Sequence, residues 1–188
     1  MARGRKTQYI RAVKTTEQRA LKHLFRTGVA TKHQLETHYG LKGERLQKFV
    51  NSQFFTFQQD LVRLDKKGIE YCERVLDMKH RYISSSHHLK HDLKMSEAYA
   101  RLPEKTQDTW KTENQLFLEA KKNPSFQAFR AQIEQKYRTF NAVPDAAIQH
   151  PVTGEWMAFE CLTDNYRESD IEQKESFSHT YLNGIVQY

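Results

Sequence analysis

Apolar residues recur at helical spacing in the segment TTEQRALKHLFRTG, near the start of the chain. The apolar stripe of this segment consists of Ala20, Leu21, Leu24 and Phe25. A stripe of this kind predicts an amphipathic helix with one buried face. Thr15 or Thr16 is suited to cap the start of the helix, and Gly28 is suited to end it.

Two shorter helical patterns follow. In ATKHQLETHYG, Thr31 is the expected cap and Gly40 the expected stop. The segment LKGERLQKFVNSQFF predicts a third helix over about residues 42–53. This helix is expected to turn Leu46, Phe49 and Val50 inward and Lys42, Arg45 and Lys48 outward. Three short helices joined by glycine-bearing turns predict a helix-turn-helix unit.

The apolar pattern changes from helical to strand-like after the third helix. Residues 54–57 and 61–64 form two β-like runs around the polar turn Gln58-Gln59-Asp60, and a new helix follows LDKKG. Three helices followed by a hairpin form a winged helix-turn-helix. In such a fold the third helix enters the major groove of DNA.

Charge favours a nucleic-acid partner for this half of the chain. The net charge is +7, and residues 1–85 hold 18 Lys and Arg against 8 Asp and Glu, whereas residues 86–188 hold 12 against 15. Binding to phosphates releases counterions, so the basic half predicts binding to double-stranded DNA. The expected contacts are Lys42, Arg45, Gln47, Lys48 and Asn51 in the third helix, Arg63, Lys66 and Lys67 after it, and Arg3 and Arg5 in a basic N-terminal arm.

Two alternatives stay open for this half. A winged helix that pairs proteins would carry the same charges as ordinary solvated faces. The basic N-terminal arm either contacts the minor groove and phosphates or remains a solvated tail.

The segment SSSHHLKHDLKMSEAYARLPE predicts a domain boundary followed by a linker helix, because a serine run precedes apolar residues at helical spacing. His87 and His91, like His88 and His91, are one helical turn apart, a spacing that suits a metal ion. No carboxylate or cysteine motif supports that role. The chain therefore divides into residues 1–82, a winged-helix domain with its basic arm, and residues 83–188, which begin with the linker helix.

Strands and helices are both expected in the second half. A helix beginning near Thr112 carries Glu113 in its first turn, and AAI and WMAFECL are strands joined by the turn PVTGEW. The segment SDIEQKESFSHTYLN is a further helix, with Ser169 as its expected cap and Glu172 at the capping-box position.

Two carboxylates flank the turn between these strands. Asp145 follows Pro144 just before the first strand, and Glu160 lies inside the second. A hairpin brings such residues together at one end of a sheet, where paired carboxylates suit Mg²⁺, which prefers hard oxygen ligands. The alternative is that Pro-Asp is a common loop pair and that Glu160 is an exposed edge-strand residue.

The order of Glu113, Asp145 and Glu160 resembles the metal-dependent nuclease fold named for its Pro-Asp…(Asp/Glu)-x-Lys motif. The resemblance implies a twisted mixed sheet flanked by helices, in which Asp145 and Glu160 hold one or two Mg²⁺ ions and Glu113 assists. Leu162 stands where the motif has its catalytic lysine. Lys174, on the next helix, is the residue expected to supply an ammonium group from a shifted position.

Nearly the whole chain is similar to the replication-relaxation family, which occurs on plasmids and mobile elements of Gram-positive bacteria. The resemblance rests on a winged helix, the SHHLKHDL helix, a Trp followed by a Glu, a Pro-Asp strand and the FECLTD strand before a lysine-bearing helix. It implies a role in plasmid replication, DNA relaxation or transfer, with replication or relaxosome proteins as further partners.

The expected fold class is therefore α+β, with an N-terminal winged helix-turn-helix followed by a small restriction-endonuclease-like α/β domain. The main interpretation is a DNA-binding accessory or regulatory protein of a mobile element, with an inactive nuclease-like domain because one catalytic position is missing. An active Mg²⁺-dependent endonuclease and a protein-interaction module of a replication or transfer complex are the alternatives.

The absence of long apolar runs and the spacing of the cysteines indicate the cellular location of the protein. No apolar run is long enough to span a membrane, and the basic N-terminus lacks the apolar stretch of a secretory signal. Cys72 and Cys161 are far apart, without metal-ligand partners nearby, which predicts reduced thiols in a cytoplasmic protein without a membrane partner. A homodimer stays open.

Overall fold

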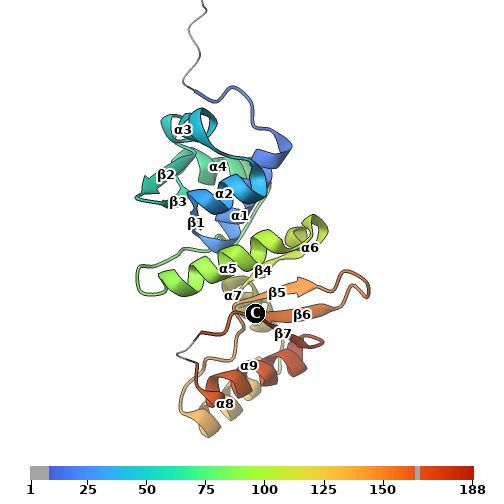
Figure 1. Ribbon diagram of the computed structural model, residues 1–188. Coiled ribbons are helices and arrows are strands. Elements are labelled where there is room, and N and C mark those ends of the chain that lie inside the picture. Colours follow the sequence, from blue (N-terminus) through green and yellow to red (C-terminus); the bar gives the residue numbers. More distant parts are fainter. Residues whose placement is uncertain (1–8, 164–165) are drawn as a thin grey trace, which may run out of the picture. The chain divides into compact units, whose positions relative to one another are not determined.

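The computed structural model describes residues 9–163 and 166–188 and divides the chain into two compact units, Met1–Arg101 and Leu102–Tyr188 (Figure 1). Helices and two small sheets make the chain α+β, as expected. Arg3 and Arg5, two of the predicted DNA contacts, lie outside the described residues. Within the described residues, no helix has both the length and the apolar character needed to cross a membrane.

The first unit combines helices with a three-stranded antiparallel sheet in the order β1-β3-β2. Its helices are α1 (Thr15–Thr27), α2 (Lys32–Tyr39), α3 (Gly43–Asn51), α4 (Lys66–Arg74) and α5 (Leu89–Arg101). Its strands are β1 (Ala30–Thr31), β2 (Phe55–Gln58) and β3 (Leu61–Leu64). The hairpin of β2 and β3 closes over Gln59 and Asp60, close to the turn that the sequence predicts.

Local sequence signals define the C-terminal ends of α1 and α2 and the start of α2, as expected. Gly28 and Gly40 terminate these helices in the left-handed conformation, with φ of 77° and 66°. A Cβ atom at Gly28 would also lie 2.6 Å from the Ser84 backbone nitrogen, so a larger residue does not fit there. Thr31 caps α2, and its hydroxyl accepts the Gln34 N–H at 3.0 Å.

The start of α1 differs from the expectation. The helix begins at Thr15, and the residue before it, Lys14, is the N-cap. The Lys14 N–H donates to Glu17 Oε2 at 2.7 Å. The carboxylate of Glu17, at the third helical position, therefore accepts the backbone N–H of the N-cap residue. Neither Thr15 nor Thr16 is the cap.

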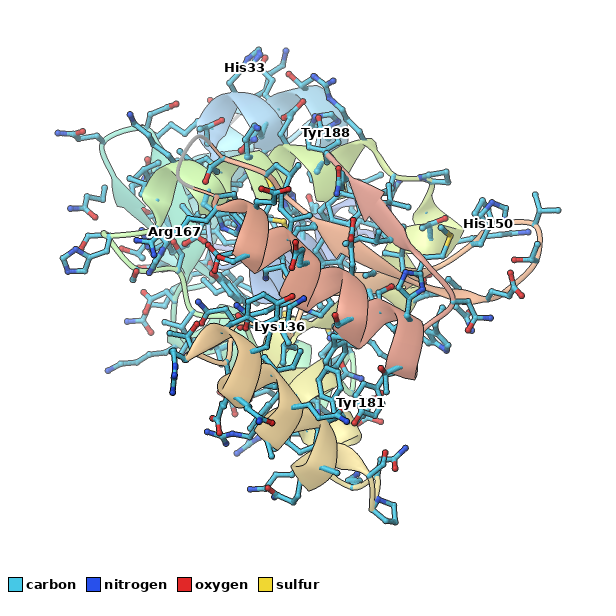
Figure 2. The ribbon with its side chains drawn as sticks, turned by 90° about the horizontal axis from the view of Figure 1, so that it is seen from below. His33, Lys136, His150, Arg167, Tyr181 and Tyr188 are labelled. Atoms are coloured by element: carbon cyan, nitrogen blue, oxygen red, sulfur yellow. The ribbon has the colours of Figure 1, made fainter. Side chains whose placement is uncertain are left out.

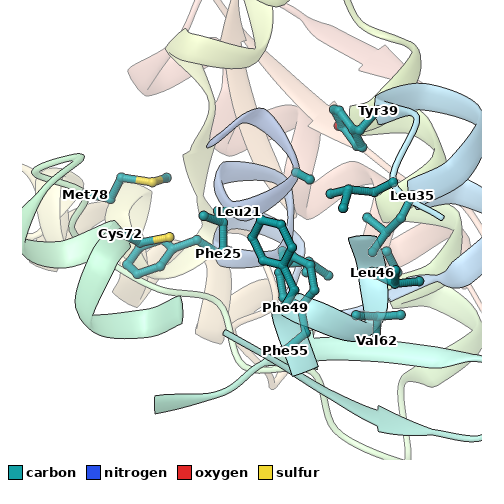
Figure 3. Close-up of a cluster of buried hydrophobic side chains, with 14 residues drawn as sticks. Leu21, Phe25, Leu35, Tyr39, Leu46, Phe49, Phe55, Val62, Cys72 and Met78 are labelled. Carbon is teal, nitrogen blue, oxygen red and sulfur yellow. The ribbon is translucent and has the colours of Figure 1, made fainter. Parts of the chain in front are cut away.

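The core of the first unit gathers side chains from α1, α2, α3 and the sheet (Figure 3). Leu46 and Phe49 are buried there, and Val50 packs at the margin, as the periodicity of α3 predicts. The Phe49 ring stacks on that of Phe55, with centroids 4.8 Å apart. This packing determines which face of α3 remains available to solvent.

Polar contacts fasten α5 to α1 and α2. His23 Nε2 lies 2.8 Å from Ser96 Oγ, and Gln34 Nε2 donates to Glu97 Oε2 at 3.0 Å. The division between the units accordingly falls after Arg101, whereas the sequence placed a boundary at residue 82. Apolar periodicity alone does not reveal contacts made by histidine, serine and glutamine side chains.

The second unit contains a mixed sheet in the order β4-β5-β6-β7, in which only the β6–β7 pair is parallel. Its strands are β4 (Lys111–Thr112), β5 (Ala146–Gln149), β6 (Trp156–Glu160) and β7 (Ile185–Gln187). Its helices are α6 (Glu104–Thr109), α7 (Glu113–Ala120), α8 (Phe126–Tyr137) and α9 (Glu168–Tyr181). The β5–β6 hairpin and the start of α7 after Thr112 match the expectation, whereas α6, α8, β4 and β7 were not expected.

The start of α9 also corrects the sequence interpretation. The helix begins at Glu168, and the Arg167 N–H donates to Asp170 Oδ2 at 3.2 Å. Ser169 therefore lies inside the first turn and is not the cap. Glu172 instead accepts hydrogen bonds from the side chains of Lys136 and Tyr137.

Aromatic rings dominate the core between α8 and α9. The Phe129 ring meets those of Phe177 and Tyr181 edge to face, at centroid distances of 6.1 and 5.3 Å. In Figure 2 the two helices run next to one another, with Lys136 near one end of their contact and Tyr181 near the other. This packing holds α9, the helix that carries Lys174, in place.

Candidate functional site

The solvent-facing side of α3 carries amide and ammonium groups. Gln47 and Asn51 are exposed, and Gln47 Nε2 donates to Asn51 Oδ1 at 3.0 Å. Lys48 is half-buried one residue after Gln47. Lys42 Nζ lies 3.0 Å from Glu36 Oε1 in an ion pair whose side chains are 69% and 48% exposed. Such an exposed pair is weak, so Lys42 is available to another acidic partner.

Arg45 differs from the other candidates on α3 because its half-buried guanidinium is held in a bidentate ion pair within the first unit. Its Nε and Nη2 atoms donate to the two carboxylate oxygens of Glu17 at 2.6 and 2.7 Å, and Nη2 also donates to Ala12 O at 2.9 Å. The Glu17 side chain is 5% exposed. Burial acts to raise the pKa of Glu17, but hydrogen bonds from Arg45 and the Lys14 backbone hold this pKa below its usual value. Arg45 therefore connects α3 to α1 and to the segment before α1.

The described part of the N-terminal arm lies against the end of α3. The Ile10 N–H donates to Ser52 Oγ at 2.8 Å, and the Ile10 side chain packs on the core. Arg11 and Lys14 are exposed in the same segment. Basic residues that precede α1 are thus anchored next to α3.

The other predicted contacts lie on β3 and at the start of α4. Arg63 is half-buried on β3, and Lys66 and Lys67 are exposed in the first turn of α4. The Lys67 N–H donates to Gln53 O at 3.0 Å, so the start of α4 adjoins the end of α3. Among the described residues, Lys48, Lys66 and Lys67 have no acidic partner.

In the second unit, strand pairing brings Asp145 and Glu160 together. Ala146 pairs with Phe159, so Asp145 and Glu160 are opposite one another where the two strands meet. The Asp145 N–H donates to Glu160 Oε2 at 3.0 Å, and the Cys161 N–H donates to Asp145 Oδ2 at 2.9 Å. Each carboxylate therefore binds a backbone N–H group of the other chain segment.

Lys174 reaches this pair from α9. Its ammonium lies 2.9 Å from Glu160 Oε1 and donates to Val143 O, also at 2.9 Å. The Tyr166 hydroxyl donates to the same Glu160 oxygen. The structure thus places the Lys174 ammonium beside Glu160, and it does so from the helix on which the sequence analysis expected this lysine.

Burial controls the electrostatics of this cluster. The Glu160 side chain is 1% exposed, and burial raises its pKa, with a further upward contribution from the charge of Asp145. Lys174 and Tyr166 oppose this change because they stabilise the ionised carboxylate. Burial and the nearby carboxylates also raise the pKa of Tyr166.

Glu113 joins the same end of the sheet through its backbone. It is the first residue of α7, and its N–H donates to Asp145 O at 3.0 Å. The residue is exposed, whereas Glu160 is buried. The sequence therefore identified three segments that meet at this end of the sheet.

The carboxylate oxygens of Asp145 and Glu160, as they are arranged here, do not fit the coordination of Mg²⁺. Both oxygens of Glu160 and one oxygen of Asp145 already accept hydrogen bonds from N–H or O–H groups. Mg²⁺ requires oxygen ligands in near-octahedral geometry and retains bound water. In the part of the chain that the structure describes, no group of three or more His, Cys, Asp or Glu residues is arranged to hold a metal ion.

Two important residues were missed by sequence reasoning. Glu17 looks like an ordinary first-turn residue of α1, and Tyr166 lies in the connection between β6 and α9. Only the tertiary fold brings them to Arg45 and Glu160.

Comparisons with known protein families, curated proteins and solved structures find no match for this chain.

Proposed function

We propose that the first unit is a winged helix-turn-helix that binds double-stranded DNA, and that the protein is an accessory or regulatory protein of a plasmid or mobile element. The observation that carries this proposal is the solvent face of α3, where Gln47, Lys48 and Asn51 lie within about one helical turn. The β2–β3 hairpin follows α3 in chain order, as the wing does in this class of fold.

The chemistry of α3 suits base recognition. An amide side chain forms paired hydrogen bonds with adenine in the major groove, whereas a lysine binds guanine or a phosphate. Gln47 and Asn51 supply the amides, and Lys48 supplies the ammonium group. The two amides lie on one face of the helix because they are four residues apart, and Gln47 Nε2 donates to Asn51 Oδ1 at 3.0 Å.

The surroundings of α3 suit the DNA backbone. Lys66 and Lys67 adjoin its C-terminal end, and Arg11 lies in the segment anchored there through Ile10. Backbone contacts position a protein on the duplex without reading its sequence. The lysines are therefore assigned to phosphates and the two amides to bases.

Selection of bound fragments from random duplex DNA tests this function directly, with the full-length protein in the presence and absence of Mg²⁺. Recovery of a preferred sequence, bound with an affinity that falls as salt rises, is the expected result. If the protein does not bind DNA even at low salt, the DNA-binding function is excluded. The alternative, a protein-interaction module, would then remain.

For the second unit we propose a nuclease-like fold that does not cleave DNA. The occupied carboxylate oxygens and Leu162 support this assignment. The competing function is an Mg²⁺-dependent endonuclease, which is favoured by the proximity of Asp145, Glu160 and Lys174. Nicking of supercoiled plasmid that requires Mg²⁺ and is lost in Asp145→Ala would establish the endonuclease instead.

A further inference from the structure

We infer that Lys174 is the built-in cation of the second unit, and that its ammonium takes the place of the divalent metal ion that a nuclease-like fold would hold between Asp145 and Glu160. This inference rests on the nuclease-like assignment of the second unit. It is independent of DNA binding by the first unit.

The contacts of the Lys174 ammonium are those of a bound cation. It lies 2.9 Å from a carboxylate oxygen of Glu160 and 2.9 Å from the carbonyl oxygen of Val143. Carboxylate and carbonyl oxygens are also the ligands of hard metal ions in proteins. The Lys174 side chain is 9% exposed, so its charge is held inside the unit and is not directed to solvent.

The remaining hydrogen bonds close the cluster around this ammonium. Glu160 Oε2 accepts the Asp145 N–H, Asp145 Oδ2 accepts the Cys161 N–H, and the Tyr166 hydroxyl donates to the oxygen that Lys174 contacts. A metal ion would have to displace the Lys174 ammonium, which lies 2.9 Å from Glu160 Oε1, before it could reach this oxygen. The cluster instead joins the β5–β6 hairpin to α9 and to the segment that contains Val143.

A nearby positive charge stabilises the ionised form of a buried carboxylate, and either an ammonium or a metal ion provides that charge. If Lys174 is that charge, its removal takes the ion-pair partner from Glu160 Oε1 and leaves the charge of the carboxylates uncompensated, which favours the entry of a divalent ion. If Lys174 is instead the catalytic lysine of a metal-dependent nuclease, the wild-type protein binds the metal while Lys174 is present. The two roles therefore predict opposite effects of Lys174 on metal affinity.

Calorimetric titration of the full-length protein with Mn²⁺ and Mg²⁺, at constant ionic strength, distinguishes these roles. We expect no saturable binding to the wild-type protein at this site. We expect Lys174→Met to gain saturable Mn²⁺ binding, at least about tenfold tighter than the weakest affinity that the titration detects, and to show a rise in Tm with Mn²⁺ that wild type lacks. Adding Asp145→Asn to Lys174→Met should abolish both effects.

Lys136→Met is the matched control, because Lys136 also pairs with a glutamate, Glu172, but its side chain is 67% exposed. This variant should gain no metal binding. A folded Lys174→Met protein without metal affinity would overturn the inference. Saturable Mn²⁺ binding to wild type that is lost in Asp145→Asn would overturn it as well, and this titration decides the question even if Lys174→Met does not fold. Salt-dependent DNA binding, measured separately on the wild-type protein, tests the proposed DNA-binding function without reference to metal binding.

Discussion

Arg45 and Glu17 form a two-hydrogen-bond ion pair that joins α3 to α1, with donor–acceptor distances of 2.6 and 2.7 Å. The same Glu17 carboxylate accepts the Lys14 N–H at the start of α1, and the same guanidinium donates to Ala12 O. One ion pair therefore holds the start of α1, the preceding segment and the proposed DNA-reading helix together. It gives Arg45 a structural role that the sequence did not predict.

Replacing Arg45 by alanine should lower the free energy of unfolding. The substitution removes charged hydrogen bonds and leaves the nearly buried Glu17 carboxylate without its partner, a loss of about 1.5–3 kcal/mol. Urea denaturation followed by circular dichroism measures this change. Lys42→Ala, which breaks the exposed pair with Glu36, is the control and should change stability by only about 0–1 kcal/mol. Equal losses in the two variants would contradict the structural role of Arg45.

Substitutions of Lys48 and of the amides on α3 should affect DNA binding in different ways. Lys48→Ala should weaken binding to all sequences and reduce the dependence of log affinity on log salt by about 1, as expected for a phosphate contact. Gln47→Ala and Asn51→Ala should instead each reduce discrimination between sequences by about 1–3 kcal/mol, because each removes an amide side chain that we propose reads a base. Fluorescence anisotropy with the selected duplex and a scrambled duplex measures both effects.

The control for these variants is Lys122→Ala, which removes one exposed lysine from the second unit and leaves α3 unchanged. Its DNA affinity should equal that of wild type. If Lys48→Ala and Lys122→Ala behave alike, α3 does not contact DNA, and the charge of the first unit is an ordinary solvated face.

Local sequence signals predicted much of the fold because they act within a few residues. Gly28 and Gly40 provide left-handed helix ends, and Thr31 caps its own helix. The turn between β5 and β6 likewise required Asp145 and Glu160 to approach each other. These features depend on backbone geometry that the neighbouring residues determine.

Features that depend on tertiary partners were not predictable in this way. Glu17 accepts the N–H of Lys14, the N-cap of α1, and is held there by Arg45, which is 28 residues away. Ser169 is displaced as a cap because Asp170 accepts the Arg167 N–H. Tyr166 lies outside any helical or strand-like pattern of apolar residues. Its contact with Glu160 forms only when β6 and α9 pack together.

The buried histidine of the first unit should make its stability depend on pH. His23 stacks on Tyr99, with centroids 5.0 Å apart, and burial lowers the pKa of His23 from 6.5 to about 3. The unfolded chain therefore binds a proton at a pH where the folded chain does not. Stability should fall as pH decreases from about 6.5 toward 3, by up to about 1.4 kcal/mol per pH unit from this group.

Urea denaturation between pH 7.5 and 4.5 measures the contribution of His23. His23→Gln should have a lower free energy of unfolding at pH 7.5 and a shallower loss as the solution is acidified. His33→Gln is the control, because His33 is an exposed residue of α2. A slope in His23→Gln that is as steep as that of wild type would show that other groups control the acid sensitivity.

The first unit should require α5 for its stability. Ser96 and Glu97 of α5 hydrogen-bond to His23 and Gln34, and Tyr99 of α5 is 1% exposed against the His23 ring. A fragment ending at Arg101 keeps these contacts, whereas a fragment ending at residue 80 exposes a buried imidazole and the apolar surface around it. We expect cooperative urea unfolding and salt-dependent DNA binding from residues 1–101, and a lower unfolding midpoint from residues 1–80. Equal midpoints for the two fragments would show that α5 is only a linker, as the sequence pattern alone suggested.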